Sequence, residues 1–112
     1  MEIARHSSVE NDLKKLKRFA APEKSLEAWE RLFALKGLNE TPAIEIYRGF
    51  GDRKIYKARV VPLQENLGKS RGYRVLFEVV NKNQIKILIF TRHGIYDSEE
   101  ELIAIIRERL NN

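Results

Sequence analysis

The chain has 112 residues and a formal net charge of +5, which arises from 21 lysines and arginines and 16 aspartates and glutamates. Its 43% hydrophobic and 33% charged residues are typical of one folded domain, which we place at residues 1–112, and exclude a disordered chain. The absence of cysteine excludes disulfides and thiolate metal sites, and no apolar run approaches the about 20 residues that span a bilayer, so we expect a cytoplasmic protein without a membrane segment.

The N-terminal part has the pattern of a short strand followed by a helix. Residues 3–6 fit a first strand, and Ser7 and Glu10 have the spacing of a capping box, which is typical of a helix start. Apolar residues then recur at helical spacing, at Val9, Leu13, Leu16, Phe19 and Ala20. Asp12 and the basic residues after it fall between them, so we expect these charges on the solvent side of the helix.

A second amphipathic helix follows after a short connection. Ala21-Pro22 interrupts the first helix, and proline is favoured in the first turn of the next one. The apolar stripe of this second helix consists of Leu26, Trp29, Leu32 and Phe33. Gly37 is predicted to end it, because glycine is common just after a helix. Two neighbouring helices with so short a link predict an antiparallel helical hairpin.

From residue 43 the spacing of apolar residues changes from the helical period to the alternation of β-strands. Four strands are predicted, at residues 43–47, 55–61, 73–80 and 85–92. The last two are joined by Asn81-Lys82-Asn83, which predicts a tight hairpin turn.

The C-terminal residues have the pattern of a third helix. Ser98 and Glu101 form a second capping box, and the acidic residues at its start and arginines near its end suit the helix dipole. The predicted fold class is therefore α+β: an N-terminal helical hairpin packed on one face of a four-stranded antiparallel sheet, with a C-terminal helix.

The positive charge is concentrated in the strand region between Arg48 and Arg92. This stretch contains 11 basic and 3 acidic residues, a local net charge of +8, so the rest of the chain carries −3. Because the stretch consists mainly of predicted strands, its cations should gather on a face of the sheet. A basic sheet face is a site for phosphate groups, and above all for nucleic acid.

Alternation along the strands predicts which of these cations share a face. The face away from the helical hairpin should carry Lys57, Arg59, Arg74, Lys86 and Arg92, together with the apolar Leu76, Leu88 and Phe90. We expect the C-terminal helix to cover the apolar residues and to leave the cations around a shallow cleft. Single basic residues on strands serve solubility, but five like charges on one face destabilise a sheet, which favours an acidic ligand.

Two residues after the last strand can transfer protons beside such a cleft. Both Tyr96 and His93 follow Arg92 closely, and packing or turn formation is the alternative role for each. The chain has two histidines, His6 and His93, without the His-x-x-His or His-x-His spacing of a zinc site, so no metal and no cofactor are predicted.

Three sequence blocks occur in a fixed order along the strand region. The first is Ile-Tyr-Lys-Ala-Arg-Val at residues 55–60, and the second is Gly-Lys-Ser-Arg-Gly-Tyr-Arg-Val-Leu-Phe at residues 68–77. The third is Thr-Arg-His at residues 91–93, which follows the apolar strand at residues 85–90 and is itself followed by Tyr96. These blocks resemble those of the RelE/ParE superfamily of bacterial and archaeal toxins. The resemblance covers essentially the whole chain and implies the RelE-like fold.

The resemblance also implies a chemistry. RelE-type members enter the ribosomal A site and cleave mRNA without a metal, by attack of the RNA 2′-hydroxyl on the adjacent phosphate. By matching positions, Lys57 and Arg59 would form a basic catalytic pair. Arg74 would stabilise the pentacovalent phosphate, where preorganised cations are most effective. Arg92 and Tyr96 would flank the leaving group.

Further residues and partners follow from the same resemblance. His93 is an alternative proton carrier, because the segment between Arg92 and Tyr96 is short for this family and Arg59 is a poor base where some members have lysine. Contacts to RNA are expected from Lys54, Lys69, Arg71 and Lys86. The expected partners are mRNA on the ribosome and a cognate acidic antitoxin, without a small-molecule cofactor.

The alternative interpretation is a non-catalytic protein of the same fold. ParE-type relatives keep the fold without the nuclease residues and act on DNA gyrase. A binding module that recognises only RNA or the antitoxin belongs to the same alternative.

Overall fold

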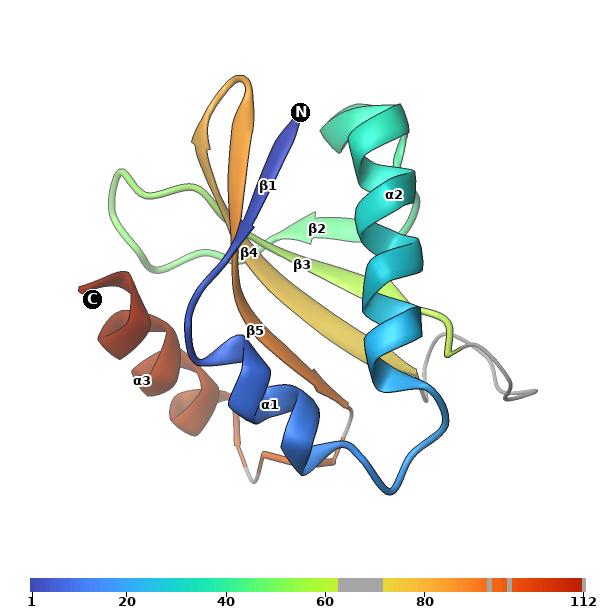
Figure 1. The fold of residues 1–112 in the computed structure, drawn as a ribbon. Helices are drawn as coiled ribbons and strands as arrows, with labels where there is room; N and C mark the ends of the chain where they lie inside the picture. The colour runs from blue at the N-terminus through green and yellow to red at the C-terminus, as the bar shows by residue number, and fades with distance from the viewer. Residues whose placement is uncertain (63–71, 93, 97, 112) are drawn as a thin grey trace.

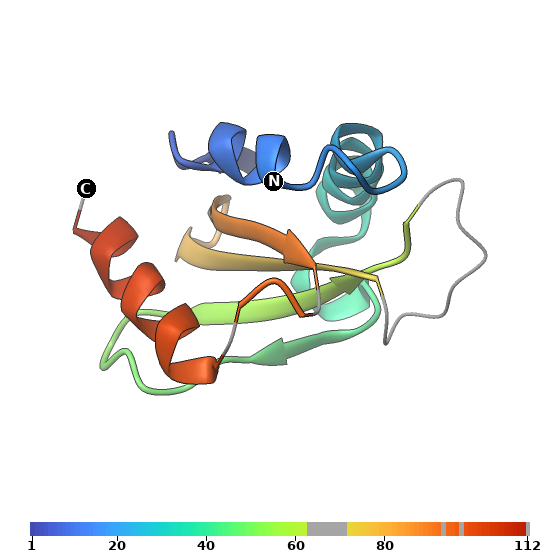
Figure 2. The same ribbon diagram turned by 90° about the horizontal axis from the view of Figure 1, so that it is seen from below.

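The computed structural model describes residues 1–62, 72–92, 94–96 and 98–111. Its elements in chain order are β1 (Glu2–Arg5), α1 (Val9–Lys15), α2 (Pro22–Glu40), β2 (Ile44–Ile46), β3 (Ile55–Val60), β4 (Tyr73–Asn81), β5 (Gln84–Arg92) and α3 (Glu99–Leu110). The helices α1 and α2 cover one face of a single sheet, and α3 lies on the other side (Figure 1 and Figure 2). None of the helices in these residues is long and apolar enough to cross a membrane.

The sheet has five strands, in the order β1-β5-β4-β3-β2. The α+β class is confirmed, but the prediction of four antiparallel strands is wrong. The strand β1 joins β5 in parallel, with Ile3 opposite Ile85, so the sheet is mixed. The short strand predicted at residues 3–6 is present, at Glu2–Arg5, but its place in the sheet was not predicted, because its partner lies about eighty residues away in the sequence.

The predicted helical hairpin is also not formed as such. The helix α1 has seven residues and lies against β5, whereas the 19-residue α2 lies over β1 and β3. The two helices therefore cover different parts of the same sheet face (Figure 1). The first capping box is wrong as well, because Ser8 precedes α1 without a side-chain cap, and the His6 ring nitrogen Nδ1 accepts a hydrogen bond from the Ser8 backbone N–H, 3.0 Å away.

The boundaries of α2 and α3 agree better with the sequence. Pro22 lies in the first turn of α2 as predicted. Gly37, the predicted end of the helix, has φ 76° and interrupts α2, but the helix continues beyond it to Glu40. The Ser98 side chain accepts a hydrogen bond from the Glu101 backbone N–H, so the predicted helix start with Ser98 as its N-cap is confirmed.

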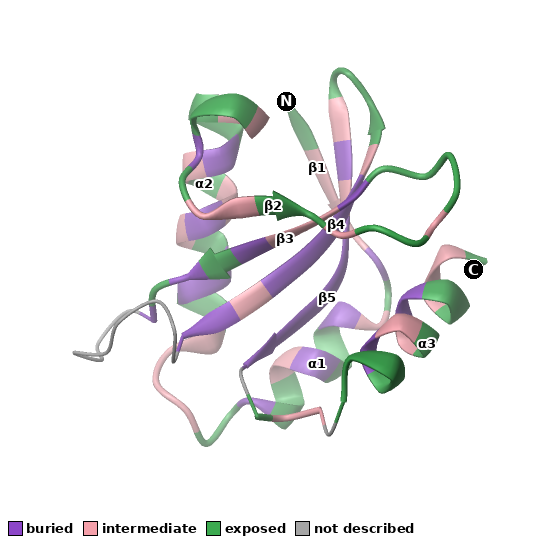
Figure 3. Cartoon of the chain, turned by 180° about the vertical axis from the view of Figure 1, so that it is seen from behind, coloured by how far each residue is buried: buried purple, intermediate pink, exposed green. Residues whose placement is uncertain are grey.

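The larger core lies between the sheet and α1 and α2. Trp29 and Phe33 of α2 pack against Phe77 of β4, with ring centroids 5.1 to 5.5 Å apart. The alternation predicted for β4 is confirmed, since Tyr73, Val75 and Phe77 all belong to this core. Figure 3 shows the buried residues running along the central strands.

A β-bulge in β5 changes which side chains face which side. Leu76 pairs with Ile89 and the next residue, Phe77, pairs with Ile87, so Leu88 is an extra residue in β5. Leu88 and Ile89 therefore both face α3, and Phe90 returns to the core under α1 and α2. The predicted face of Phe90 is wrong for this reason, and so is the face towards the N-terminal helices that strict alternation predicts for Ile89.

The bulge is held by a buried ion pair between the first and last helices. Both oxygens of Asp12 accept hydrogen bonds from the Arg109 guanidinium, at 2.7 and 2.9 Å, and 1% of the Asp12 side chain is exposed. Asp12 also accepts from the Phe90 N–H, and Arg109 donates to the Leu88 carbonyl. The pair thus provides hydrogen-bond partners for backbone groups of β5 that lie beyond the end of β1. The prediction that Asp12 lies on the solvent side of the helix is wrong.

Candidate functional site

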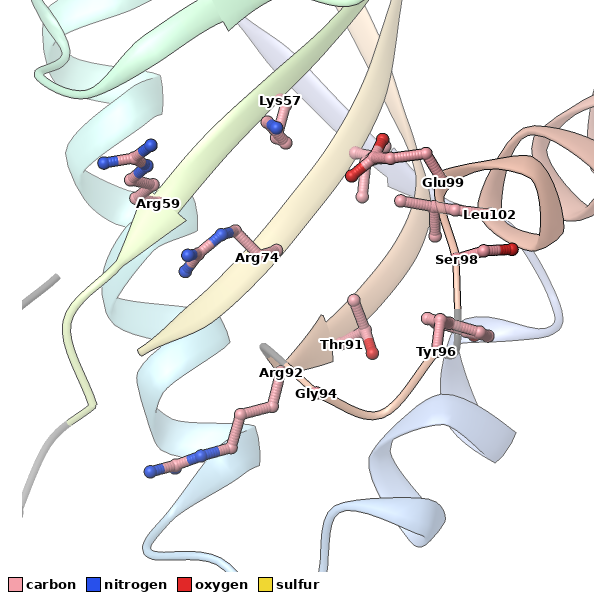
Figure 4. A pocket seen from close by; sticks show the side chains of 11 residues that line it. Lys57, Arg59, Arg74, Thr91, Arg92, Gly94, Tyr96, Ser98, Glu99 and Leu102 are labelled. Atoms are coloured by element: carbon pink, nitrogen blue, oxygen red, sulfur yellow. The ribbon is translucent and has the colours of Figure 1, made fainter. Parts of the chain in front are cut away.

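A cleft of about 530 Å³ opens between the open part of the sheet and the segment that leads into α3. Figure 4 shows Arg59 and Arg74 on the sheet side and Tyr96, Ser98 and Glu99 on the other wall. The residues that line it are Lys57, Arg59, Arg74, Leu76, Thr91, Arg92, Gly94, Tyr96, Ser98, Glu99 and Leu102. Five of the six residues predicted as catalytic are among them, from three different strands and the following loop.

Two arginines face each other across neighbouring strands on the sheet side. Arg59 of β3 and Arg74 of β4 are directly opposite in the antiparallel register. Partial burial, and then the positive charge of Arg59, lower the pKa of Arg74. Gly72 precedes β4 and lies against the end of β3. Any larger residue would disturb the pairing of the two strands there, because a Cβ at position 72 would lie 2.4 Å from the Val60 carbonyl oxygen. Like charges so close together favour an anion between them.

Lys57 lies two residues before Arg59 on β3 and pairs with Leu76 of β4. Its Nζ is 3.6 Å from Glu45 Oε1 and 5.5 Å from the centre of the Tyr47 ring. Tyr47 in turn donates a hydrogen bond from its hydroxyl to Glu99. Burial, and then this hydrogen bond, raise the pKa of Tyr47, so its phenol keeps its proton.

Tyr96 belongs to the wall opposite the arginines. It reaches the cleft, although the segment that joins it to β5 is short. Burial is the main cause that raises the pKa of Tyr96, and the charge of Asp12 adds to it, so the phenol is neutral at physiological pH. A neutral phenol can donate a hydrogen bond or a proton.

Arg92 lies at the end of the cleft and is turned towards the helices. The bulge gives it the same face as Tyr73, its partner in register, and not the face of Arg74. Its guanidinium carbon is 4.4 Å from the Phe19 ring centre and 5.2 Å from that of Tyr73. Arg92 therefore lines the cleft as predicted, but from the opposite side of β5.

The cleft is also lined by residues that were not predicted from the sequence to belong to the site. Leu76 and Leu102 supply apolar surface, and Thr91 stands opposite Arg74 in register. Glu99 supplies a carboxylate. Its place at a helix start was visible in the sequence, but its proximity to β2 and β3 was not.

The residues predicted to contact RNA outside the catalytic set are dispersed. Lys54 is exposed just before β3, and Lys86 lies opposite Glu78 in register, and neither lines the cleft. Lys69, Arg71 and His93 lie outside the described residues.

The described residues of the cleft carry an excess of positive charge. Among its described lining residues, four cationic side chains stand against the single carboxylate of Glu99. No cluster of three histidine, aspartate or glutamate side chains is found within the described ranges. This composition suits a phosphate-bearing ligand.

Comparisons with models of protein families, with curated proteins and with solved structures gave no match for this chain. The resemblance to the RelE/ParE superfamily therefore remains a prediction from the sequence blocks.

Proposed function

We propose that this chain is the toxin of a toxin–antitoxin pair and cleaves mRNA on the translating ribosome, as RelE-type proteins do. The observation that carries the proposal is the cleft, in which three strands bring four cationic side chains together opposite the neutral phenol of Tyr96. Strand-borne cations are positioned more rigidly than cations on loops, which suits stabilisation of a charged transition state.

The reaction assigned to this cleft is an internal transfer within RNA. The 2′-oxygen forms a bond to the adjacent phosphorus, the bond to the 5′-oxygen breaks, and the products are a 2′,3′-cyclic phosphate and a 5′-hydroxyl. Arg59 and Arg74 would bind the phosphate oxygens on which charge accumulates. Tyr96 would give its proton to the leaving 5′-oxygen, since its raised pKa means that the phenol carries this proton at physiological pH.

A base must also remove the proton of the 2′-hydroxyl. Lys57 is the candidate that the sequence blocks imply, and it lies on the sheet side of the cleft. Glu99, on the opposite wall, is a second group that can accept a proton. Single substitutions Lys57→Ala and Glu99→Gln separate the two, because loss of the base should lower the cleavage rate by about 10²–10⁴.

The proposed partner is an acidic antitoxin that covers the cleft in the cytoplasm. A disordered acidic segment would associate quickly with this basic surface, and its on-rate should fall steeply with salt. If the antitoxin displaces α3, it must replace the burial of Leu102 and Ile106 and break the contact of Arg109 with Asp12. Amide hydrogen exchange of α3 in the free and bound toxin would detect this, and equal protection in both states would exclude displacement.

Induced expression in a bacterium, followed by primer extension on cellular transcripts, tests the nuclease. We expect growth arrest together with new 5′ ends inside translated regions. The same ends should be absent with Arg74→Ala and present with Lys82→Ala, which removes an exposed cation in the β4–β5 turn. Arrest without any transcript cleavage would defeat the proposal.

A second candidate is a binding module of the same fold that does not cleave RNA. Two contacts favour it: Lys57 is paired with Glu45, and Glu99 places a negative charge in the cleft. Both reduce the attraction for phosphate at the position where a base is needed. This candidate predicts arrest, or RNA binding, with transcripts left intact.

A further inference from the structure

A second cationic surface adjoins the cleft at the end of α1. It consists of the exposed Lys14, Lys15, Lys17 and Arg18, which we term the α1 basic segment. None of the four forms an ion pair with any residue that the structure describes. Four like charges within five residues repel one another, and an anionic ligand would relieve this repulsion.

Arg92 joins this segment to the cleft. It lines the cleft, and its guanidinium carbon lies 4.4 Å from the Phe19 ring centre, while that of Arg18 lies 4.9 Å from the same ring. Both guanidinium groups therefore meet at one aromatic side chain. The β5 bulge is the cause, because it turns Arg92 towards the α1–α2 connection.

Lys15 provides a second connection. It lies with Thr91 and Tyr96 around one crevice beside α1, and both of these residues also line the cleft. The cationic surface thus continues from the cleft, past the end of β5, to the exposed side of α1.

We propose that the α1 basic segment binds the phosphates of a single-stranded RNA whose reacting part lies in the cleft. This inference rests on the proposed function, and it extends the same site to a longer substrate. RNA is favoured over an acidic protein because a guanidinium plane and an aromatic ring, here those of the exposed Arg18 and the adjacent Phe19, are surfaces on which bases stack. An acidic peptide would use the charges alone.

The test compares two variants that remove the same charge. The first replaces Lys14, Lys15, Lys17 and Arg18 with glutamine. The matched control replaces Lys24, Arg31, Lys36 and Lys82, which are also exposed, with glutamine. Circular dichroism and melting temperature establish that both variants fold.

Binding is measured by fluorescence anisotropy with 2′-O-methylated RNA, which cannot undergo the cleavage. The probes are a trinucleotide and an oligonucleotide of about 15 nucleotides, which spans a site of the usual length. We expect the first variant to lose affinity for the long probe only. The slope of log Kd against log salt should fall by about 2–3, because four fewer phosphate contacts remove about 0.7 each.

Three results would overturn the inference. The first is an equal loss with both variants, which would mean a general effect of net charge. The second is an unchanged salt slope for the long probe. The third is a loss of binding to a polyglutamate peptide with RNA binding retained, which would assign the segment to an acidic protein. Because the probe resists cleavage, none of these results depends on whether the wild-type protein is a nuclease.

Discussion

Two pairs of charged side chains lie on this sheet, one of opposite charges and one of like charges. Asp12 and Arg109 are opposite charges, bonded twice to each other and once each to the edge of β5. Arg59 and Arg74 are like charges, placed directly opposite each other on β3 and β4. The first pair joins opposite charges within the protein, whereas the second brings two positive charges together.

The first pair stabilises the fold, whereas the second pair belongs to the candidate functional site. The Asp12–Arg109 pair joins α1, β5 and α3, which are far apart in the sequence, so it fixes the walls of the cleft. The Arg59–Arg74 pair opposes the strand pairing that contains it, because like charges directly opposite each other repel. Features that reduce stability without a local gain are typical of functional sites.

Breaking the first pair should have the largest effect. Asp12→Asn leaves the Arg109 charge buried without its partner, which typically costs about 3–5 kcal/mol of unfolding free energy. Urea denaturation measures it. Asp52→Asn is the matched control, because Asp52 is exposed and forms no ion pair with a described residue, and it should change the unfolding free energy little.

A double substitution sharpens this prediction. Asp12→Leu combined with Arg109→Met removes both charges and keeps similar volume, and should regain part of the lost stability. An unfolding free energy for Asp12→Asn equal to that of the control would mean that the pair does not hold α3 in place.

Breaking the second pair should change activity and not stability. Arg74→Ala removes a partly buried cation that points away from the core, so no core cavity forms, and it relieves the repulsion from Arg59. We expect RNA cleavage to fall by about 10²–10³, with a melting temperature that is unchanged or slightly higher. A clearly lower melting temperature, or normal killing of cells, would show that Arg74 has another role. Lys82→Ala serves as the control.

The contrast between the two pairs also explains what the sequence could predict. Alternation in β3 and β4 depends on neighbouring residues, so the placement of Lys57, Arg59 and Arg74 on one face followed from the pattern and agrees with the structure. The start of α2 at Pro22, its break at Gly37 and the Ser98 cap are equally local.

The features that the sequence did not reveal depend on distant contacts. The local sequence predicts Asp12 as a surface charge, because nothing near it indicates its partner, Arg109, which is 97 residues away. The bulge at Leu88 reverses the expected faces of Ile89 and Phe90, and no residue type in that apolar run marks it. The same bulge redirects Arg92 from the sheet face of the cleft to Phe19.

A smaller effect on stability is expected from protonation of His6, which lies near the Asp12–Arg109 pair. Burial is the main cause that lowers the pKa of His6 below its ordinary value of 6.5, and the charges of Lys86 and Arg109 add to it. The unfolded chain therefore binds a proton more readily than the folded one, and stability should decrease as the pH falls below about 6.5. Protonation would also remove the Nδ1 acceptor of the Ser8 N–H.

His6→Asn tests this, because asparagine offers an oxygen acceptor to Ser8 but does not titrate. Unfolding free energies between about pH 5 and pH 8 should fall less steeply with acid in the variant than in the wild type. Parallel curves for the two proteins would mean that His6 does not contribute to the acid sensitivity.

The smallest effect on stability is expected beside the second pair, at the ion pair of Lys57 with Glu45. The two atoms are 3.6 Å apart and 59% of the Glu45 side chain is exposed, so solvent screens the attraction and its loss in Glu45→Gln should cost less than about 1 kcal/mol. Binding should change in the opposite direction. Glu45 is the negative charge that partly offsets the repulsion felt by Arg74, and removing it makes the cleft more positive.

The measurement is the affinity for a 2′-O-methylated oligonucleotide at low salt, with Glu40→Gln as the control, because Glu40 is also exposed and lies at the end of α2. We expect Glu45→Gln to bind more tightly than the control. Weaker binding would mean that Glu45 is needed to hold Lys57 in the position that contacts phosphate. The ion pair would then be part of the binding site, and the like-charged arginines would depend on it for their ligand.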